Sequence, residues 1–90
     1  MSVQVNIPQF LYHLSDGVRM IEVEGSTVGE CLDELIRRYP QLEDSIFEEK
    51  GKLRSLLNVY INLESAYPGE LSKPVRDGDK LDIMYTLVGG

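Results

Sequence analysis

An apolar stripe with the period of an α-helix is the feature that most constrains the fold of this chain. Between residues 28 and 39, apolar side chains recur three and four positions apart, and charged side chains take the opposite face. The apolar members are Val28, Cys31, Leu32, Leu35, Ile36 and Tyr39. This spacing places them on one side of a 3.6-residue helix. Such a helix needs a second layer against which to bury its apolar face.

The sequence also marks both ends of this helix. Thr27 and Glu30 fit a capping box, in which the Thr27 hydroxyl accepts a hydrogen bond from the Glu30 amide while Glu30 reaches back. Pro40 disfavours helical backbone at the residue before it, so we expect the helix to end at Tyr39.

Alternating polar and apolar residues predict strands before and after the helix. Residues 3–7 and 19–24 read as two strands of a hairpin. A third strand is expected from about Asn58, and a last strand at residues 80–85 after a turn at residues 77–79. The intervening segments are expected to be a helical turn through Leu42, Ile46 and Phe47, a polar loop at 48–52, and a short strand or bridge near Leu71 and Val75.

This order of elements indicates an α+β protein with a mixed sheet of four to five strands packed on one main helix. It is the order of the β-grasp, or ubiquitin-like, fold, in which the first and last strands lie side by side and parallel in the middle of the sheet. We therefore expect residues 1–85 to form the β-grasp domain and residues 86–90 to form a flexible C-terminal tail ending in Gly89-Gly90.

The tail is the main candidate for chemistry. Five extended residues reach at most roughly 17 Å at about 3.3–3.6 Å each, which is enough to enter a pocket of another protein. Glycine lacks a Cβ, so Gly89 and Gly90 can pass where a side chain would clash and leave the terminal carboxylate open. The alternative is an inert tail, because chain termini tolerate almost any sequence.

The other reactive residues offer little chemistry. Cys31 lies on the apolar stripe and is expected to be a core residue. His13 is the sole histidine, so a metal site built on two histidines is excluded. The sequence has no phosphate-binding glycine loop and no pairing of a nucleophile with a base. If the chain takes part in chemistry, we therefore expect it to do so with its terminal carboxylate, without a metal or cofactor of its own, while another protein supplies the catalysis.

Charge and hydropathy narrow the range of partners. The net charge is −6 and the basic residues are scattered, which disfavours binding to nucleic acid or to an anionic membrane. No run approaches the roughly 20 apolar residues of a membrane span. Residues 1–5 lack the basic and apolar regions of a signal peptide, so we expect a cytoplasmic protein.

Four segments carry a resemblance to a known family. They are residues 6–11, 24–30, 58–62 and 77–83, followed by the terminal Gly89-Gly90. In these segments the chain resembles the ubiquitin-like sulfur carrier proteins of the MoaD/ThiS group. The first and third segments look closest to the branch that serves cysteine synthase, and the small subunit of molybdopterin synthase shares the general pattern.

The resemblance implies that partner enzymes supply the catalysis. An E1-like adenylating enzyme of the MoeB or ThiF type would use ATP to adenylate the Gly90 carboxylate, and a sulfur donor would convert the adenylate to a thiocarboxylate. A synthase, either the molybdopterin synthase large subunit or a cysteine synthase, would accept that sulfur in molybdopterin, tungstopterin, cysteine or related thio-metabolite synthesis. The residues implied to bind partners are Thr86, Leu87, Val88 and Gly89.

The tail departs from the family pattern at two places. The family often has a proline shortly after the last strand, which would fix φ and stiffen the exit, where this chain has Met84-Tyr85-Thr86. Val88 stands where the family often has alanine. Two alternatives to the carrier stay open: a ubiquitin-like modifier joined to lysines through Gly90, and a binding module with an inert tail.

Overall fold

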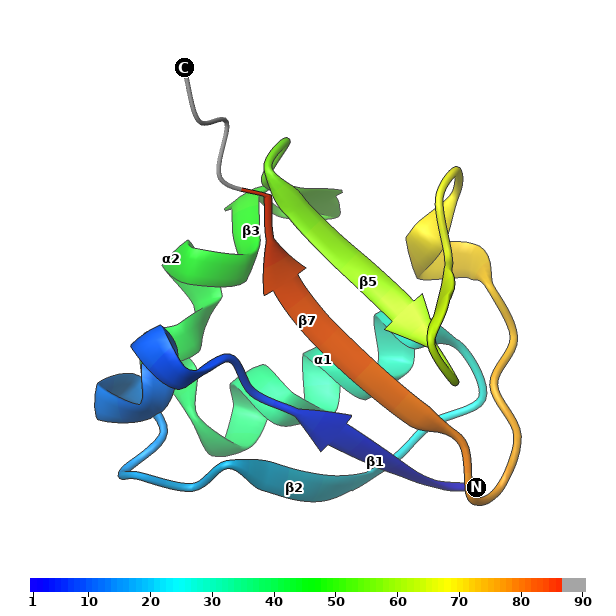
Figure 1. Ribbon diagram of the computed structural model, residues 1–90, viewed down its shortest axis with the longest axis horizontal. Helices are drawn as coiled ribbons and strands as arrows, with labels where there is room; N and C mark the ends of the chain where they lie inside the picture. The colour runs from blue at the N-terminus through cyan, green and yellow to red at the C-terminus, as the bar shows by residue number, and fades with distance from the viewer. Residues whose placement is uncertain (87–90) are drawn as a thin grey trace.

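The computed structural model describes residues 1–86. Within that range, five strands form one mixed sheet in the order β2-β1-β7-β5-β6, and helix α1 packs across it (Figure 1). The bounds are β1 Ser2–Asn6, β2 Met20–Glu24, α1 Val28–Arg38, β5 Leu57–Ile61, β6 Glu64–Ser65 and β7 Lys80–Tyr85. The connecting elements are η1 Gln9–Leu14, η2 Pro40–Leu42, α2 Glu43–Ile46, β3 Phe47–Glu49, β4 Lys52–Leu53 and η3 Glu70–Ser72.

The last strand lies in the centre of the sheet, as predicted. β7 runs parallel to β1, with Val5 opposite Leu81, and antiparallel to β5, with Val59 opposite Ile83. β1 and β2 form the predicted antiparallel hairpin. The β-grasp prediction is therefore confirmed, and the strand that leads to the candidate tail is hydrogen-bonded on both sides.

Helix α1 begins at the predicted cap. The Thr27 hydroxyl accepts a hydrogen bond from the Glu30 amide at 3.1 Å. The Glu30 carboxylate reaches back to Ser26, accepting from its backbone amide at 2.9 Å and from its hydroxyl at 2.8 Å. The helix ends at Arg38, one residue earlier than predicted, because Tyr39 before Pro40 already has non-helical backbone angles, with φ −130° and ψ 75°.

The core lies between α1 and the facing side of the sheet. Leu32 and Leu35 are fully buried, whereas Ile36 is only partly buried at the margin of the core. The sheet contributes the inward residues of each long strand: Val3, Val5, Ile21, Val23, Leu57, Val59, Leu81 and Ile83. This regular alternation leaves the other face of the sheet free of the core.

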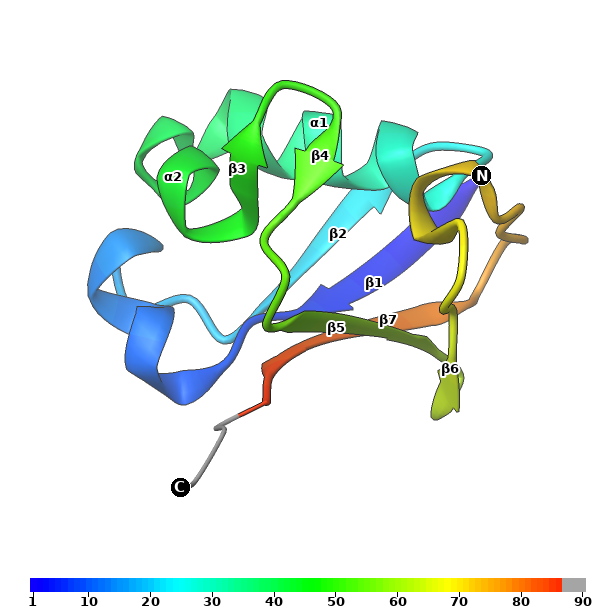
Figure 2. The ribbon, with the colours of Figure 1, turned by 90° about the horizontal axis from the view of Figure 1, so that it is seen from above.

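Figure 2 shows α1, α2, β3 and β4 on one side of the sheet, while the opposite face of β1, β7 and β5 is uncovered. We call this uncovered side the outer face. No helix in residues 1–86 is long and apolar enough to cross a membrane.

Two connecting segments differ from their predictions. Residues 48–52, expected to be a polar loop, take part in the small antiparallel hairpin β3–β4, whose pairing joins Phe47 to Leu53. Leu71 lies in η3 rather than in a strand, and the bridge forms between Thr27 and Pro74. η3 packs tightly on α1 because Gly29 has no side chain: a Cβ there would lie 3.0 Å from the Leu71 carbonyl oxygen.

Candidate functional site

The end of β7 is the part of the tail site that the structure describes. The Thr86 amide donates a hydrogen bond to the Leu56 carbonyl oxygen at 2.8 Å, which extends the ladder between β5 and β7 by one residue. The Thr86 hydroxyl accepts a hydrogen bond from the Asn58 side-chain amide. Thr86, predicted to bind a partner, is therefore tied to β5 through both its backbone and its side chain.

The remaining predicted tail residues lie outside the described residues. They are Leu87, Val88, Gly89 and Gly90. Their roles, and the division into a domain of residues 1–85 and a tail of residues 86–90, stay predictions.

An aromatic pair holds the residue before Thr86. The rings of Phe10 and Tyr85 meet edge to face, with centroids 5.1 Å apart and planes at 71°. Such pairs contribute about 0.5–1.5 kcal/mol beyond the burial of their area. Burial also raises the pKa of the Tyr85 hydroxyl above its ordinary value.

Apolar side chains line two hollows that meet at Met84, near this strand end. A shallow hollow of about 540 Å³ is lined by Pro8, Phe10, Met84 and Tyr85. A second hollow, of about 310 Å³, is lined by Tyr60, Leu63, Asp82 and Met84. Phe10, Met84 and Leu63 are 55%, 53% and 84% exposed. We call Phe10, Tyr60, Leu63, Met84 and Tyr85 the apolar patch; such exposed patches commonly mark contact sites for other proteins.

The two residues with intrinsic reactivity, Cys31 and His13, line neither of these hollows. Cys31 is fully buried on α1, as predicted, and burial raises the pKa of its thiol to about 11. His13 is exposed on η1. In residues 1–86, no three histidine, cysteine, aspartate or glutamate side chains come together so as to hold a metal ion.

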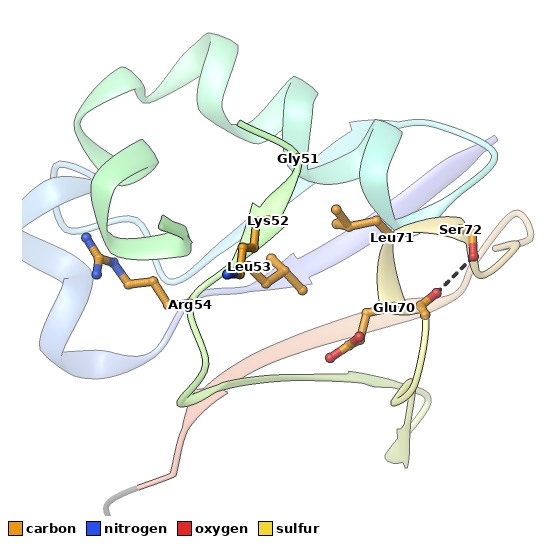
Figure 3. Close-up of a pocket in the computed structure, with 8 residues that line it drawn as sticks. Gly51, Lys52, Leu53, Arg54, Glu70, Leu71 and Ser72 are labelled. Carbon is orange, nitrogen blue, oxygen red and sulfur yellow. Dashed lines mark hydrogen bonds between the residues drawn. The ribbon is translucent and has the colours of Figure 1, made fainter. Parts of the chain in front are cut away.

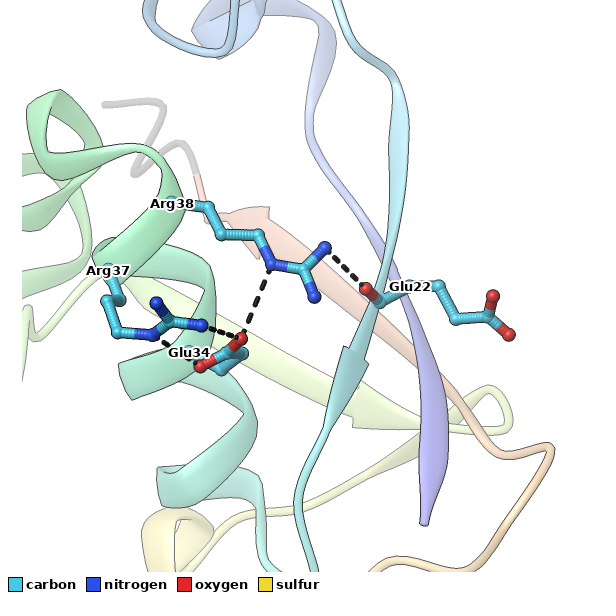
Figure 4. A network of polar contacts seen from close by, with 4 residues as sticks. All are labelled: Glu22, Glu34, Arg37 and Arg38. Carbon is cyan, nitrogen blue, oxygen red and sulfur yellow. Dashed lines mark hydrogen bonds and ion pairs between the residues drawn. The ribbon is translucent and has the colours of Figure 1, made fainter.

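The polar face of α1 carries an ion-pair network that joins the helix to the sheet edge (Figure 4). Glu34 accepts from Arg37 Nε at 2.8 Å and pairs with Arg38, four residues on, at 3.4 Å. Hydrogen bonding from Arg37 lowers the pKa of the Glu34 carboxyl. Arg38 Nη1 also donates to the Glu22 carbonyl oxygen at 3.0 Å on edge strand β2. These contacts give Glu34, Arg37 and Arg38 a structural role, which is to join α1 to β2.

A groove on the helix side of the sheet offers no reactive group either. It has a volume of about 400 Å³ and lies between β4 and η3 (Figure 3). Leu53 and Leu71 form its apolar part, while Lys52, Arg54 and Glu70 border it. The Ser72 hydroxyl is bonded to the Gly69 carbonyl oxygen at 3.0 Å, so it is engaged in its own turn.

Sequence reasoning missed the residues around the strand end. The sequence pattern assigns no role of its own to Phe10 and indicates Asn58 only as the start of a strand. One signal was present: Met84 is an apolar residue at a solvent-facing position of the β7 alternation, where a polar residue is usual.

Comparison with known proteins adds an independent line of evidence. The family model described as the ThiS family matches residues 5–90. Small archaeal modifier protein 1 of Haloferax volcanii is 37% identical over 71 residues, which cover 78% of each chain.

Solved structures agree with this match. A chain in the crystal structure of the Amycolatopsis orientalis BexX/CysO complex superposes with a TM-score of 0.88 at 34% identity, covering 98% of this chain and 99% of that one. CysO of Mycobacterium tuberculosis superposes with a TM-score of 0.85 at 27% identity, covering 94% and 99%.

Proposed function

The chain belongs to the ThiS family, and we propose that it is a sulfur carrier whose Gly90 carboxylate becomes a thiocarboxylate. As a small ubiquitin-like protein of the sulfur carrier and modifier class, it is not an enzyme. One observation carries the proposal: β7, held between β1 and β5, ends at the base of a Gly-Gly tail that the family model matches through residue 90.

The proposed reaction proceeds in two steps on a partner enzyme. The Gly90 carboxylate attacks the α-phosphorus of ATP, and pyrophosphate leaves to give an acyl adenylate. A sulfide then attacks the acyl carbon, a C–S bond forms, and AMP leaves with the electrons of the broken C–O bond. AMP is a far better leaving group than an oxide ion, which explains the need for ATP.

The partner in this step is proposed to be an E1-like adenylating enzyme that binds the outer face and the tail. The apolar patch supports this docking mode, because Phe10, Met84 and Tyr85 lie beside the strand end from which the tail starts. An enzyme that receives the tail would therefore also cover the patch. The similar chain in the BexX/CysO complex likewise comes from a structure with a partner protein.

The sulfur acceptor is proposed to be a synthase, either the molybdopterin synthase large subunit or a cysteine synthase, acting in the cytoplasm. A second function is favoured by a specific observation, the 37% identity to small archaeal modifier protein 1. In that case the activated Gly90 would be joined to lysine side chains of target proteins. Isopeptide-linked products would identify this second function.

The test uses two variants of the tail. Deleting Gly90 shortens the reach by roughly 3.5 Å, and appending an alanine after Gly90 lengthens it by a similar amount. Misplacement by even about 1 Å can cost on the order of 10²-fold in rate. We expect the adenylating enzyme, ATP and sulfide to exchange a terminal oxygen for sulfur only in the wild type, as read by intact mass.

Neither variant changes the core, so all three proteins should melt at the same temperature. Sulfuration of the deletion variant at the wild-type rate would overturn the assignment of Gly90.

A further inference from the structure

We propose that Asn58 is a positioning residue that fixes the direction in which the tail leaves the sheet, an inference that rests on the proposed function. Asn58 lies in β5, two residues after Leu56, and pairs with Met84 of β7.

The first part of the argument is the double attachment of Thr86. Its amide donates to the Leu56 carbonyl oxygen at 2.8 Å, which fixes the backbone at the strand end. Its hydroxyl accepts from the Asn58 side-chain amide, which fixes the side chain on the outer face. A single backbone bond would leave the residue free to pivot about that bond, whereas two bonds from one strand restrict the pivot.

The second part is the attachment of Tyr85 from a different element. Tyr85 packs against the core and meets the Phe10 ring edge to face at 5.1 Å. Phe10 lies in η1, whose turn is closed by a hydrogen bond from the Leu11 amide to the Pro8 carbonyl oxygen at 2.9 Å. Two consecutive residues at the tail's base are thus held by different parts of the fold.

The third part is geometric. In an enzyme that binds residues 87–90 in an extended form, those four residues would span at most roughly 14 Å, so a rotation of about 10° at the base would move the far end by roughly 2 Å. That displacement exceeds the roughly 1 Å at which alignment losses become severe. Asn58 would therefore act on the rate of the chemical step without touching the reacting atoms.

The experiment compares Asn58→Ala and Thr86→Val with the control Asn62→Ala. Asn62 follows β5 at its other end, and its side-chain amide bonds Asp79 at 2.9 Å. The control therefore removes two side-chain hydrogen bonds, the one to Asp79 and one from the Lys80 amide at 3.0 Å, at the end of β5 away from the tail. For each protein we would measure kcat and KM for sulfuration by the adenylating enzyme with ATP and sulfide, and amide hydrogen exchange at Thr86.

We expect both test variants to lower kcat by about tenfold or more, with KM within about twofold, because every residue of the apolar patch is retained. The double variant should be no worse than either single one, and Thr86→Ser should recover most of the lost rate. Thr86 amide exchange should accelerate in Asn58→Ala but not in Asn62→Ala.

An unchanged kcat in both test variants, or an equal loss of kcat in Asn62→Ala, would overturn the positioning role. A wild-type protein that is never sulfurated would instead refute the proposed function and, with it, this role. Thr86 exchange that is unchanged in Asn58→Ala would show that the hydrogen bond does not hold the tail's base.

Discussion

Burial decides which of two chemistries Cys31 can follow. A cysteine near a helix N-terminus can become a reactive thiolate, but Cys31 is fully enclosed by the core and burial raises its pKa to about 11. Removal from water disfavours the charged form, with a smaller contribution from Glu30. The thiol therefore stays protonated and inaccessible at neutral pH.

This environment predicts slow modification of Cys31 in the folded protein. At pH 8, an aromatic disulfide reagent should leave the native thiol almost unreacted and label it rapidly once denaturant unfolds the chain. The rate at which the reagent releases its coloured thiolate measures the labelling of Cys31 in the native and in the unfolded chain. Rapid native labelling would contradict the burial of Cys31. Because the pKa of Cys31 is higher in the folded than in the unfolded protein, the folded state favours the protonated thiol. Its contribution to the free energy of unfolding is therefore lost as pH rises from about 9 towards 11.

Leu35 tests the packing of the core. It is fully buried on α1, so Leu35→Ala should lower the free energy of unfolding by about 2–5 kcal/mol through lost burial and the cavity that remains. Leu63→Ala is the matched control, because Leu63 is 84% exposed and should change stability by less than about 0.5 kcal/mol. Denaturant melts measure both. A loss below about 0.5 kcal/mol for Leu35→Ala would assign the wrong face of α1 to the core.

At the scale of the element, the cap of α1 predicts a pH dependence. Hydrogen bonds from Ser26 lower the pKa of the Glu30 carboxyl. A lowered folded-state pKa stabilises the protein above the unfolded value near 4.5 and loses that contribution as pH falls through the folded value. Glu30→Gln should therefore destabilise the protein most at neutral pH, with the difference from wild type shrinking below about pH 4.5.

The measurement is the melting temperature of both proteins from pH 3 to pH 7. Thr27→Ala provides the comparison, because its hydroxyl does not titrate and its loss should cost about 0.5–2 kcal/mol at every pH. A constant difference for Glu30→Gln would show that the carboxylate charge contributes nothing to the cap.

The sequence predicted most of the regular elements because each had a strong local signal. The period of residues 28–39 identified α1, and the alternation at residues 80–85 matched β7. The hairpin β3–β4 was missed because its strands are short and polar, with pairing supported by the buried Phe47 rather than by a pattern. The contacts around Asn58 and Phe10 join residues far apart in the chain, so no local pattern could indicate them.

At the scale of the whole molecule, the two sides of the sheet have separate tasks. The helix side buries the core beneath the charged surface of α1, while Tyr60 and Met84 of the apolar patch lie on the outer face. This division predicts that an adenylating enzyme binds the outer face and not the surface of α1.

Charge reversal on α1 should leave activation nearly unchanged, and a charge in the apolar patch should impair it. Asp33→Arg combined with Arg37→Glu keeps the net charge at −6 and changes exposed side chains. Met84→Asp places a charge in the patch on a strand position that is already 53% exposed. ATP–pyrophosphate exchange should show a raised KM only for Met84→Asp. A large loss in the helix variant would move the docking surface to α1.

The parallel pairing of β1 and β7 also has a mechanical consequence. The chain enters the sheet at Ser2 and leaves it after Tyr85, at opposite ends of these neighbouring strands (Figure 1). Tension between the two ends therefore acts along the strands and loads the interstrand hydrogen bonds together, in shear, instead of opening them one after another. An enzyme that pulls on the C-terminal segment would have to break these hydrogen bonds together before the domain unfolds. The domain can therefore be held by its tail and remain folded.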